Sequence, residues 1–191
     1  MRREIVFENL VENEAYWKIL YFYFAYPDKS FSISDLALEL KIHKQTASKV
    51  VKQLAQEGFL TIEIIGRIWK ITCKPNHSYN FSRKIAYNLQ NIYQTNSISL
   101  IYEQIPHAKS IILFGSYRKG DDISSSDIDI AVEVIDDKGL EIYQLGVISQ
   151  LGYRKNIPVN VHVFSRKNIN INLFNNIANG ILLDGFLEVK P

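Results

Sequence analysis

The sequence is poor in cysteine, in net charge and in long apolar runs, and each shortage excludes a class of protein. A single cysteine, Cys73, among 191 residues cannot form an intramolecular disulfide, so we expect a protein of a reducing cytoplasm, not a disulfide-stabilised secreted scaffold. The formal net charge is only +2, which by itself does not indicate a nucleic-acid binder. The most apolar stretch, residues 16–26, contains Lys18 and is far shorter than a bilayer span, so we expect no membrane segment.

The composition that remains is that of an ordinary globular chain. Hydrophobic residues make up 47% and charged residues 22%, which excludes a disordered protein. A length of 191 residues fits one domain or two small ones.

The segment 112–134, ILFGSYRKGDDISSSDIDIAVEV, carries the strongest chemical signal. Asp127 and Asp129 alternate with apolar residues in a predicted strand, so both carboxylates project from one face while Ile128 and Ile130 face a core. Two adjacent carboxylates repel each other and favour a hard cation such as Mg²⁺, or Mn²⁺ in its place. Gly115-Ser116 ends the preceding strand and opens a helix, where free backbone N–H groups favour phosphate. Together these features indicate phosphoryl or nucleotidyl transfer.

This pattern resembles the nucleotidyltransferase fold of the DNA polymerase β superfamily. Its minimal nucleotidyltransferases carry Gly-Ser, ten residues and then Asp-x-Asp, as Gly115-Ser116 and Asp127-Ile128-Asp129 do. A basic, glycine-containing loop also matches, in the form of Arg118-Lys119-Gly120. The resemblance implies catalytic and metal-binding roles for Asp127 and Asp129, and contacts of Gly115, Ser116, Arg118 and Lys119 with a nucleoside triphosphate.

The superfamily normally places a third carboxylate on the neighbouring strand, and here that position holds Asn160, which we expect to be a neutral metal ligand. An amide oxygen can bind a cation, but it cannot act as a base. Three interpretations stay open. His162, on the same face, serves as base or ligand; Glu133, four residues beyond Asp129 on its strand, replaces the carboxylate despite its distance; or the site binds nucleotide with slow transfer or none.

The first 77 residues follow a different pattern. We predict helices at residues 15–25, at 35–40 with Ser34 as N-cap, and at 44–57, followed by a hairpin of 59–65 and 68–73. The segment 32–62 resembles the winged helix-turn-helix of MarR-like and ArsR-like regulators. This resemblance implies contacts of a recognition helix and a wing tip with DNA, through Lys44, Gln45, Thr46, Ser48, Lys49, Lys52 and Arg67. The alternative is that the winged helix serves protein contacts or dimerisation.

Helical spacing continues at residues 78–96 and 97–105. We then predict strands at 110–114, 127–135 and 157–164, helices at 138–151 and 167–179, and a last strand at 180–187. In the same region, Asp121 and Asp122 are expected to form a turn, and residues 153–155 to border a base pocket.

The sequence thus predicts an α+β protein with a winged helix-turn-helix domain (1–77), a helical connector (78–105) and a polymerase-β-like nucleotidyltransferase domain (106–191) with a small mixed sheet flanked by helices. Its expected function is to bind an NTP with Mg²⁺ and transfer NMP to a hydroxyl of protein, RNA or a small molecule. The alternative is a DNA-binding regulator that senses a nucleotide with weak or no catalysis. Expected partners are NTP, double-stranded DNA, a protein such as a toxin, and a second copy that pairs through the aromatic first helix.

Overall fold

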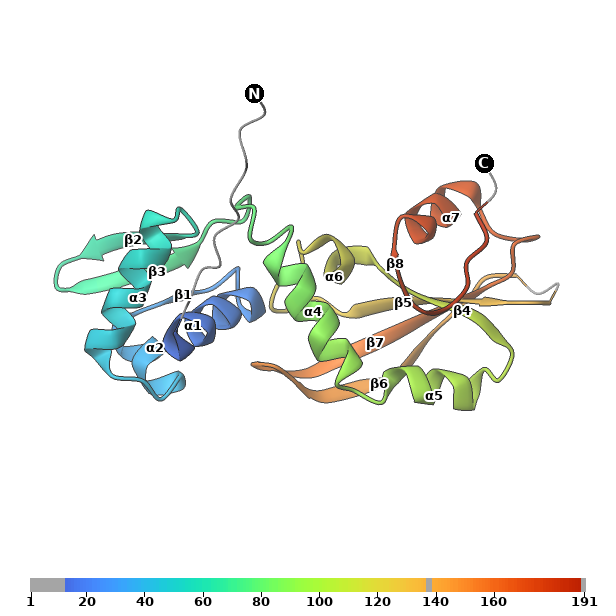
Figure 1. Cartoon of the computed structure of the whole chain (residues 1–191), viewed down its shortest axis with the longest axis horizontal. Coiled ribbons are helices and arrows are strands. Elements are labelled where there is room, and N and C mark those ends of the chain that lie inside the picture. The colour runs from blue at the N-terminus through green and yellow to red at the C-terminus, as the bar shows by residue number, and fades with distance from the viewer. Residues whose placement is uncertain (1–12, 137–138, 190–191) are drawn as a thin grey trace, which may run out of the picture.

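The computed structural model describes residues 13–136 and 139–189, so the extreme ends of two predicted domains, 1–12 and 190–191, lie outside the described residues. Two α+β parts lie end to end with one helix between them (Figure 1). The N-terminal part contains α1 (Glu14–Ala25), β1 (Ser30–Phe31), α2 (Ile33–Glu39), α3 (Lys44–Gln56), β2 (Leu60–Ile65) and β3 (Ile68–Cys73). After α4 (Arg83–Tyr93), the C-terminal part contains α5 (Ser97–Gln104), β4 (Ala108–Phe114), α6 (Gly115–Lys119), β5 (Ile128–Val134), β6 (Glu141–Leu151), β7 (Arg154–Phe164), α7 (Ile171–Ala178) and β8 (Ile181–Gly185).

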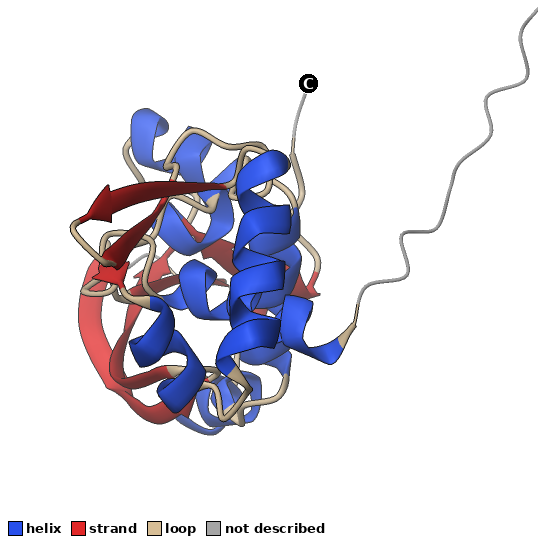
Figure 2. Cartoon of the chain, turned by 90° about the vertical axis from the view of Figure 1, so that its left-hand side faces the viewer, coloured by secondary structure: helices blue, strands red, loops and turns tan. Residues whose placement is uncertain are grey.

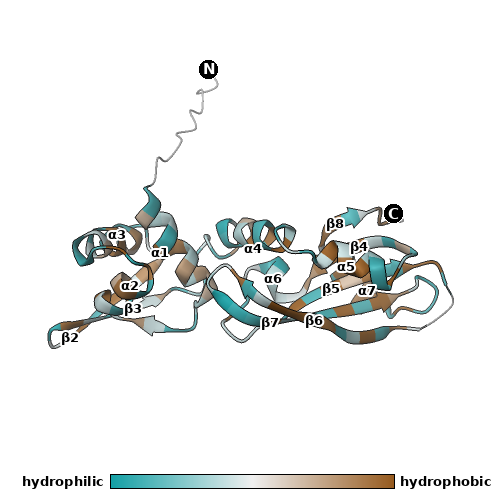
Figure 3. Ribbon diagram, turned by 90° about the horizontal axis from the view of Figure 1, so that it is seen from below, coloured by the Kyte–Doolittle hydropathy of each residue, from teal (hydrophilic) through white to brown (hydrophobic). Residues whose placement is uncertain are grey.

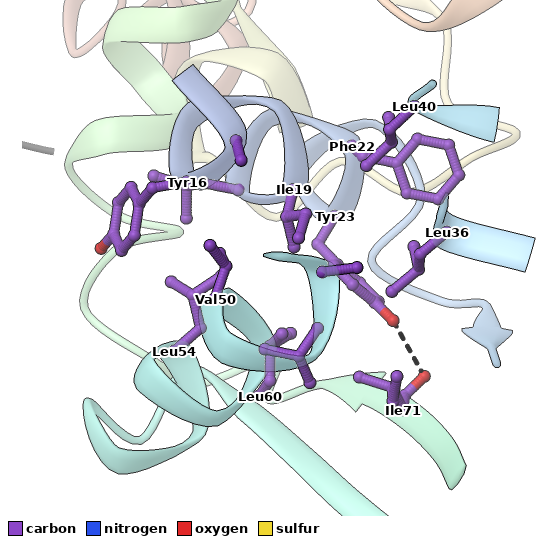
Figure 4. Packing of buried hydrophobic residues seen from close by; sticks show 14 of the residues in the cluster. Tyr16, Ile19, Phe22, Tyr23, Leu36, Leu40, Val50, Leu54, Leu60 and Ile71 are labelled. Atoms are coloured by element: carbon purple, nitrogen blue, oxygen red, sulfur yellow. Dashed lines mark hydrogen bonds between the residues drawn. The ribbon is translucent and has the colours of Figure 1, made fainter. Parts of the chain in front are cut away.

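Three helices pack on a small antiparallel sheet in the N-terminal part. The strand order is β1-β3-β2, with β2 and β3 forming the expected hairpin. The Tyr23 hydroxyl donates a hydrogen bond to the Ile71 carbonyl over 3.2 Å and so ties α1 to β3 (Figure 4). The predicted N-cap of α2 was wrong: Ser32, not Ser34, caps the helix, and Ser32 and Asp35 form a reciprocal capping box.

The aromatic residues of α1 form the interior of this part of the chain. Tyr16, Phe22, Tyr23 and Phe24 are each at most 2% exposed, and they pack against α2, α3 and the sheet (Figure 4). Most of the large side chains expected to offer a dimer surface are therefore buried within one chain, whereas Trp17 and Tyr21 are partly exposed. A homodimer remains a prediction without an assigned surface.

Helix α4 packs against both parts. The Tyr87 ring stacks on Tyr21 of α1, with ring centroids 4.7 Å apart, while Ile92 is buried in the core of the C-terminal part. In the view from below, α4 spans the junction between the two parts (Figure 3). In the end-on view, the strands gather on one side and most helices on the other (Figure 2).

The C-terminal part is built on a mixed five-stranded sheet of order β6-β7-β5-β4-β8. Strands β5 and β7 are parallel and the other pairs are antiparallel. Ile128, Ile130 and Val132 face the core covered by α4 and α5, whereas Ala131 faces the core covered by α7. Because strand residues alternate, Asp129 projects on the α7 side of the sheet.

The helix predicted at 138–151 was wrong, since the described part of this segment, from residue 139, contains the edge strand β6, and its first residue lies outside the described residues. Leu145, Ile148 and Leu151 recur at helical spacing, but the β-branched residues and Gly146 weaken a helix. Antiparallel pairing of β6 with β7 decides the outcome, with an irregularity between Gln144 and Gly146. Among the helices of the described ranges, none is both long and apolar enough to cross a bilayer.

Candidate functional site

The Gly115-Ser116 turn joins β4 to α6 and comes very close to the Asp-x-Asp strand. Gly115 has φ +70°, a conformation that glycine adopts without strain. A Cβ atom there would lie 2.6 Å from Asp129 Oδ2. The turn can approach the carboxylate because residue 115 has no side chain.

Asp127 and Asp129 lie opposite the polar residues of β7. Asp129 is in register with Asn160, and the Asn160 amide Nδ2 donates a hydrogen bond to Asp127 Oδ2. His162 Nε2 lies 3.3 Å from Asp129 Oδ1. The predicted residues of the two strands therefore come together, with one polar β7 side chain against each carboxylate.

The two ring nitrogens of His162 have different surroundings. Nε2 faces Asp129, and Nδ1 is buried without a hydrogen-bond partner among the described residues. The ring also meets Phe114 edge-on, with centroids 4.9 Å apart. This geometry favours His162 as a residue that orients Asp129 over His162 as a general base.

A small hollow of about 190 Å³ lies beside the turn, between α6 and α7. Arg118 and Lys119 line it on α6, and Arg118 Nε is buried without a hydrogen-bond partner within 13–136 and 139–189. Asn176 and Asn179 of the α7 segment complete the wall. Sequence reasoning missed both asparagines; the clustering of asparagine in residues 168–179 was the available signal.

Residues 96–184 match the model of the polymerase beta, nucleotidyltransferase family. The match covers α5 through most of β8 and includes the Gly-Ser turn, both aspartates and Asn160. This match and the mixed sheet with its flanking helices support a nucleotidyltransferase-like fold for the C-terminal part. No curated protein matches the chain.

The side chains gathered at this site suit a cation that takes few protein ligands. No three His, Cys, Asp or Glu side chains of the described residues gather into a metal-binding group. Asp127 and Asp129, with the Asn160 amide oxygen if that amide is turned, offer two charged oxygens and a neutral one. Mg²⁺ is commonly held by one or two carboxylates with phosphate and water, so these residues fit it.

Glu133 is not a substitute for the third carboxylate. Its side chain is buried in a separate cluster, 2.5 Å from Arg166 Nε, 3.7 Å from Lys109 Nζ and 3.2 Å from Ser110 Oγ. This carboxylate lies near two cationic side chains at the far end of β5, so its role is structural and it is not a ligand of the site.

A buried polar network supports the loop before Asp127, and here the sequence-based assignments were wrong. Asp122, expected to be a turn former, is instead 2% exposed and lies 3.2 Å from Lys84 Nζ. Asn88 Nδ2 donates to Asp122 Oδ1 over 2.9 Å. Burial raises the pKa of Asp122 and lowers the pKa of Lys84, while their mutual attraction opposes both shifts.

Two residues of the segment expected to border a base pocket, Tyr153 and Arg154, make structural contacts. The buried Arg154 guanidinium donates to the Tyr117 hydroxyl and to the Ser126 carbonyl. Tyr153 packs edge-on against Phe22 of α1. Tyr153 therefore joins the two parts, while Arg154 makes its contacts within the C-terminal part.

The residues predicted to contact DNA lie around a groove of about 840 Å³ in the N-terminal part. Lys44, Gln45, Ser48, Lys49 and Lys52 of α3 line it with Arg67 at the hairpin turn, whereas Thr46 is absent from the lining. The rest of the lining is mixed, with Ile33, Ile68 and Trp69 beside Ser32 and Ser34. Ile64, Ile65 and Ile68 leave the hairpin tip exposed and apolar on both sides of Arg67.

Proposed function

We propose that the C-terminal domain binds a nucleoside triphosphate with Mg²⁺ or Mn²⁺ and transfers NMP to a hydroxyl of a protein, an RNA or a small molecule. The observation that supports this most is the approach of the Gly115 turn to Asp129, which leaves no room for a Cβ. A phosphate-binding turn and a pair of carboxylates are thereby held at one place on the sheet.

Each residue of the site has a role in this proposal. The Ser116 hydroxyl and the backbone N–H groups of α6 hold phosphate oxygens, and Arg118 and Lys119 offset the charge of the triphosphate. Asp127 and Asp129 hold the cation, with the Asn160 oxygen as a neutral ligand. When bound, that cation neutralises charge that develops on the transferring phosphoryl group.

The transfer forms one bond and breaks one. The acceptor oxygen bonds to the α-phosphorus, the bond from that phosphorus to the β-phosphate bridge breaks, and pyrophosphate leaves. The acceptor proton must pass to a base. Asn160 cannot take this proton, which leaves Asp127 and Asp129 as the candidate bases. Because the same two carboxylates also hold the cation, we expect slow transfer.

Calorimetric titration of each NTP with Mg²⁺ or Mn²⁺ tests the proposal. We expect metal-dependent binding of at least one NTP to the wild type and its loss in Asp127→Ala/Asp129→Ala. Asp121→Ala removes an exposed carboxylate of the same loop and should bind as the wild type does. If no NTP binds with either metal, the proposal is wrong. Where binding is found, label transfer from an α-labelled NTP that is lost in Asp129→Ala separates a transferase from a nucleotide sensor.

A second candidate function is DNA-associated regulation, in which the N-terminal part acts as a winged helix and the nucleotide is sensed. The basic groove between α3 and the β2–β3 hairpin favours it, because four cations line one concave surface. Asn160 favours it too, since the site has one carboxylate fewer than the family pattern.

For DNA binding, we expect Lys49→Ala to weaken binding of duplex DNA at every sequence and to lower the salt slope, d log K/d log[salt], by about 0.9. Fluorescence anisotropy of a labelled promoter fragment across a salt series measures this. Lys155→Ala, which removes an exposed lysine of β7, should leave the slope unchanged. Absence of binding at low salt would eliminate this candidate and leave protein contact as the use of the groove.

A further inference from the structure

The turn after α1 reaches across to the loop that leads into Asp127. Asp28 lies in this turn, and its Oδ1 accepts a hydrogen bond from the Ser124 backbone N–H over 2.9 Å. Its Oδ2 accepts a second from the Ser124 hydroxyl over 2.7 Å. We propose that Asp28 is a positioning residue of the nucleotide site, through which the N-terminal part holds the loop in the form that presents Asp127. This inference rests on the proposed function of the site.

The rest of the loop is anchored from other directions. At its start, Lys84 and Asn88 of α4 hold the buried Asp122. At its end, Arg154 holds the Ser126 carbonyl, one residue before Asp127. Ser124 lies between these anchors, and the contact with Asp28 holds it from the outer side.

Asp28 is itself held in place by neighbouring contacts between the two parts. The Tyr26 hydroxyl donates to the Tyr153 carbonyl over 2.7 Å. The Phe22 ring lies edge-on to Tyr153, with centroids 5.4 Å apart. These contacts fix the end of α1, so that the turn carrying Asp28 projects onto Ser124.

The two hydrogen bonds from Ser124 to Asp28 act together, and we call this pair of bonds the clamp. Because the Asp28 carboxylate accepts one hydrogen bond from the Ser124 backbone and one from the Ser124 hydroxyl, it restrains both the backbone and the side chain of Ser124. Partial burial alone would raise the pKa of Asp28, but the two bonds from Ser124 hold it below its usual value. Asp28 is therefore charged at neutral pH and keeps both acceptor oxygens.

Without the clamp, Ser124 loses its restraint and Asp127 spends part of its time away from the cation. Only the fraction with Asp127 in place binds well, so the apparent affinity falls by that fraction. We expect Asp28→Ala to weaken metal-dependent NTP binding roughly three- to tenfold, in keeping with the loss of hydrogen bonds to a charged group.

Calorimetry on the full chain, with the NTP and metal that the wild type binds, measures this change. Asp28→Asn keeps one oxygen acceptor for the Ser124 N–H and should restore most of the affinity. Asp121→Ala removes an exposed carboxylate of the loop and should stay within about twofold of the wild type, because salt screens exposed charges. Ser124→Ala should weaken binding less than Asp28→Ala, and combining them should add nothing.

Hydrogen exchange of the Ser124 amide tests the clamp in the absence of nucleotide. We expect the Ser124 amide to exchange roughly tenfold faster in Asp28→Ala than in the wild type, with Asn88 and the strands of the sheet unchanged. If Asp28→Ala has the NTP affinity and the Ser124 exchange rate of the wild type, this inference is wrong while the proposed function still stands. If the variant only lowers the unfolding temperature, with unchanged affinity, Asp28 is structural and the inference is wrong. If the wild type binds no NTP, the proposed function falls and this inference with it.

Discussion

Lys84→Met is expected to destabilise the protein by about 3–5 kcal/mol, because it leaves the Asp122 carboxylate charged and buried without its cation. The two side chains are 1% and 3% exposed, so water cannot replace the lost partner. Asn88 would remain as a donor to Asp122, which does not compensate for a missing charge. Urea unfolding followed by far-UV circular dichroism measures the loss. Both tryptophans, Trp17 and Trp69, lie in the N-terminal part, so their fluorescence reports separately on that part.

Two further variants serve as controls for the loss of stability in Lys84→Met. Lys84→Met/Asp122→Asn removes both charges and should recover a substantial share of the stability, with a coupling of about 1.5 kcal/mol or more. Lys70→Met breaks the exposed pair with Glu63, 3.5 Å apart, and should cost at most about 1 kcal/mol. A loss below about 1 kcal/mol for Lys84→Met would show that the pair does not hold α4 against the loop.

Gly115→Ala is expected to weaken metal-dependent NTP binding by roughly ten- to a hundredfold while the chain remains folded. The new Cβ would lie 2.6 Å from Asp129 Oδ2, so the carboxylate must move. The left-handed backbone at φ +70° adds a cost to the folded state of about 1 kcal/mol. Calorimetry and thermal unfolding on the same preparation separate the loss of affinity from the loss of stability.

Gly146→Ala is the matched control for that variant. Gly146 lies on the edge strand β6, and its φ is not in the left-handed region. A Cβ there would meet no atom of residues 13–136 and 139–189 within 4 Å. We expect wild-type affinity and stability. Unchanged NTP binding in Gly115→Ala would mean that the turn and Asp129 do not act together on the ligand.

The sequence was most informative where function depends on short spacings. Asp127 directly precedes β5 and Asp129 lies in it, two residues on, and the turn at Gly115 needs a residue without a Cβ, so both features can be inferred locally. The hairpin of β2 and β3 and the helix α5 were likewise predicted from periodicity and turn residues, and the structure confirms them. The resemblance to the superfamily placed Asn160 on the strand beside the aspartates, and its register with Asp129 agrees.

The sequence by itself determined the two carboxylates, the glycine turn and the amphipathic segments, because each depends on neighbours a few positions away. Only the tertiary structure decided that residues 141–151 form a strand, since pairing with β7 outweighs an ambiguous local pattern. It also decided the role of Asp122, whose partner Lys84 is 38 positions away, and of Asp28, which contacts Ser124 across 96 positions. The cost of burying a charge, and the partner that offsets it, are set by the folded surroundings and not by local sequence.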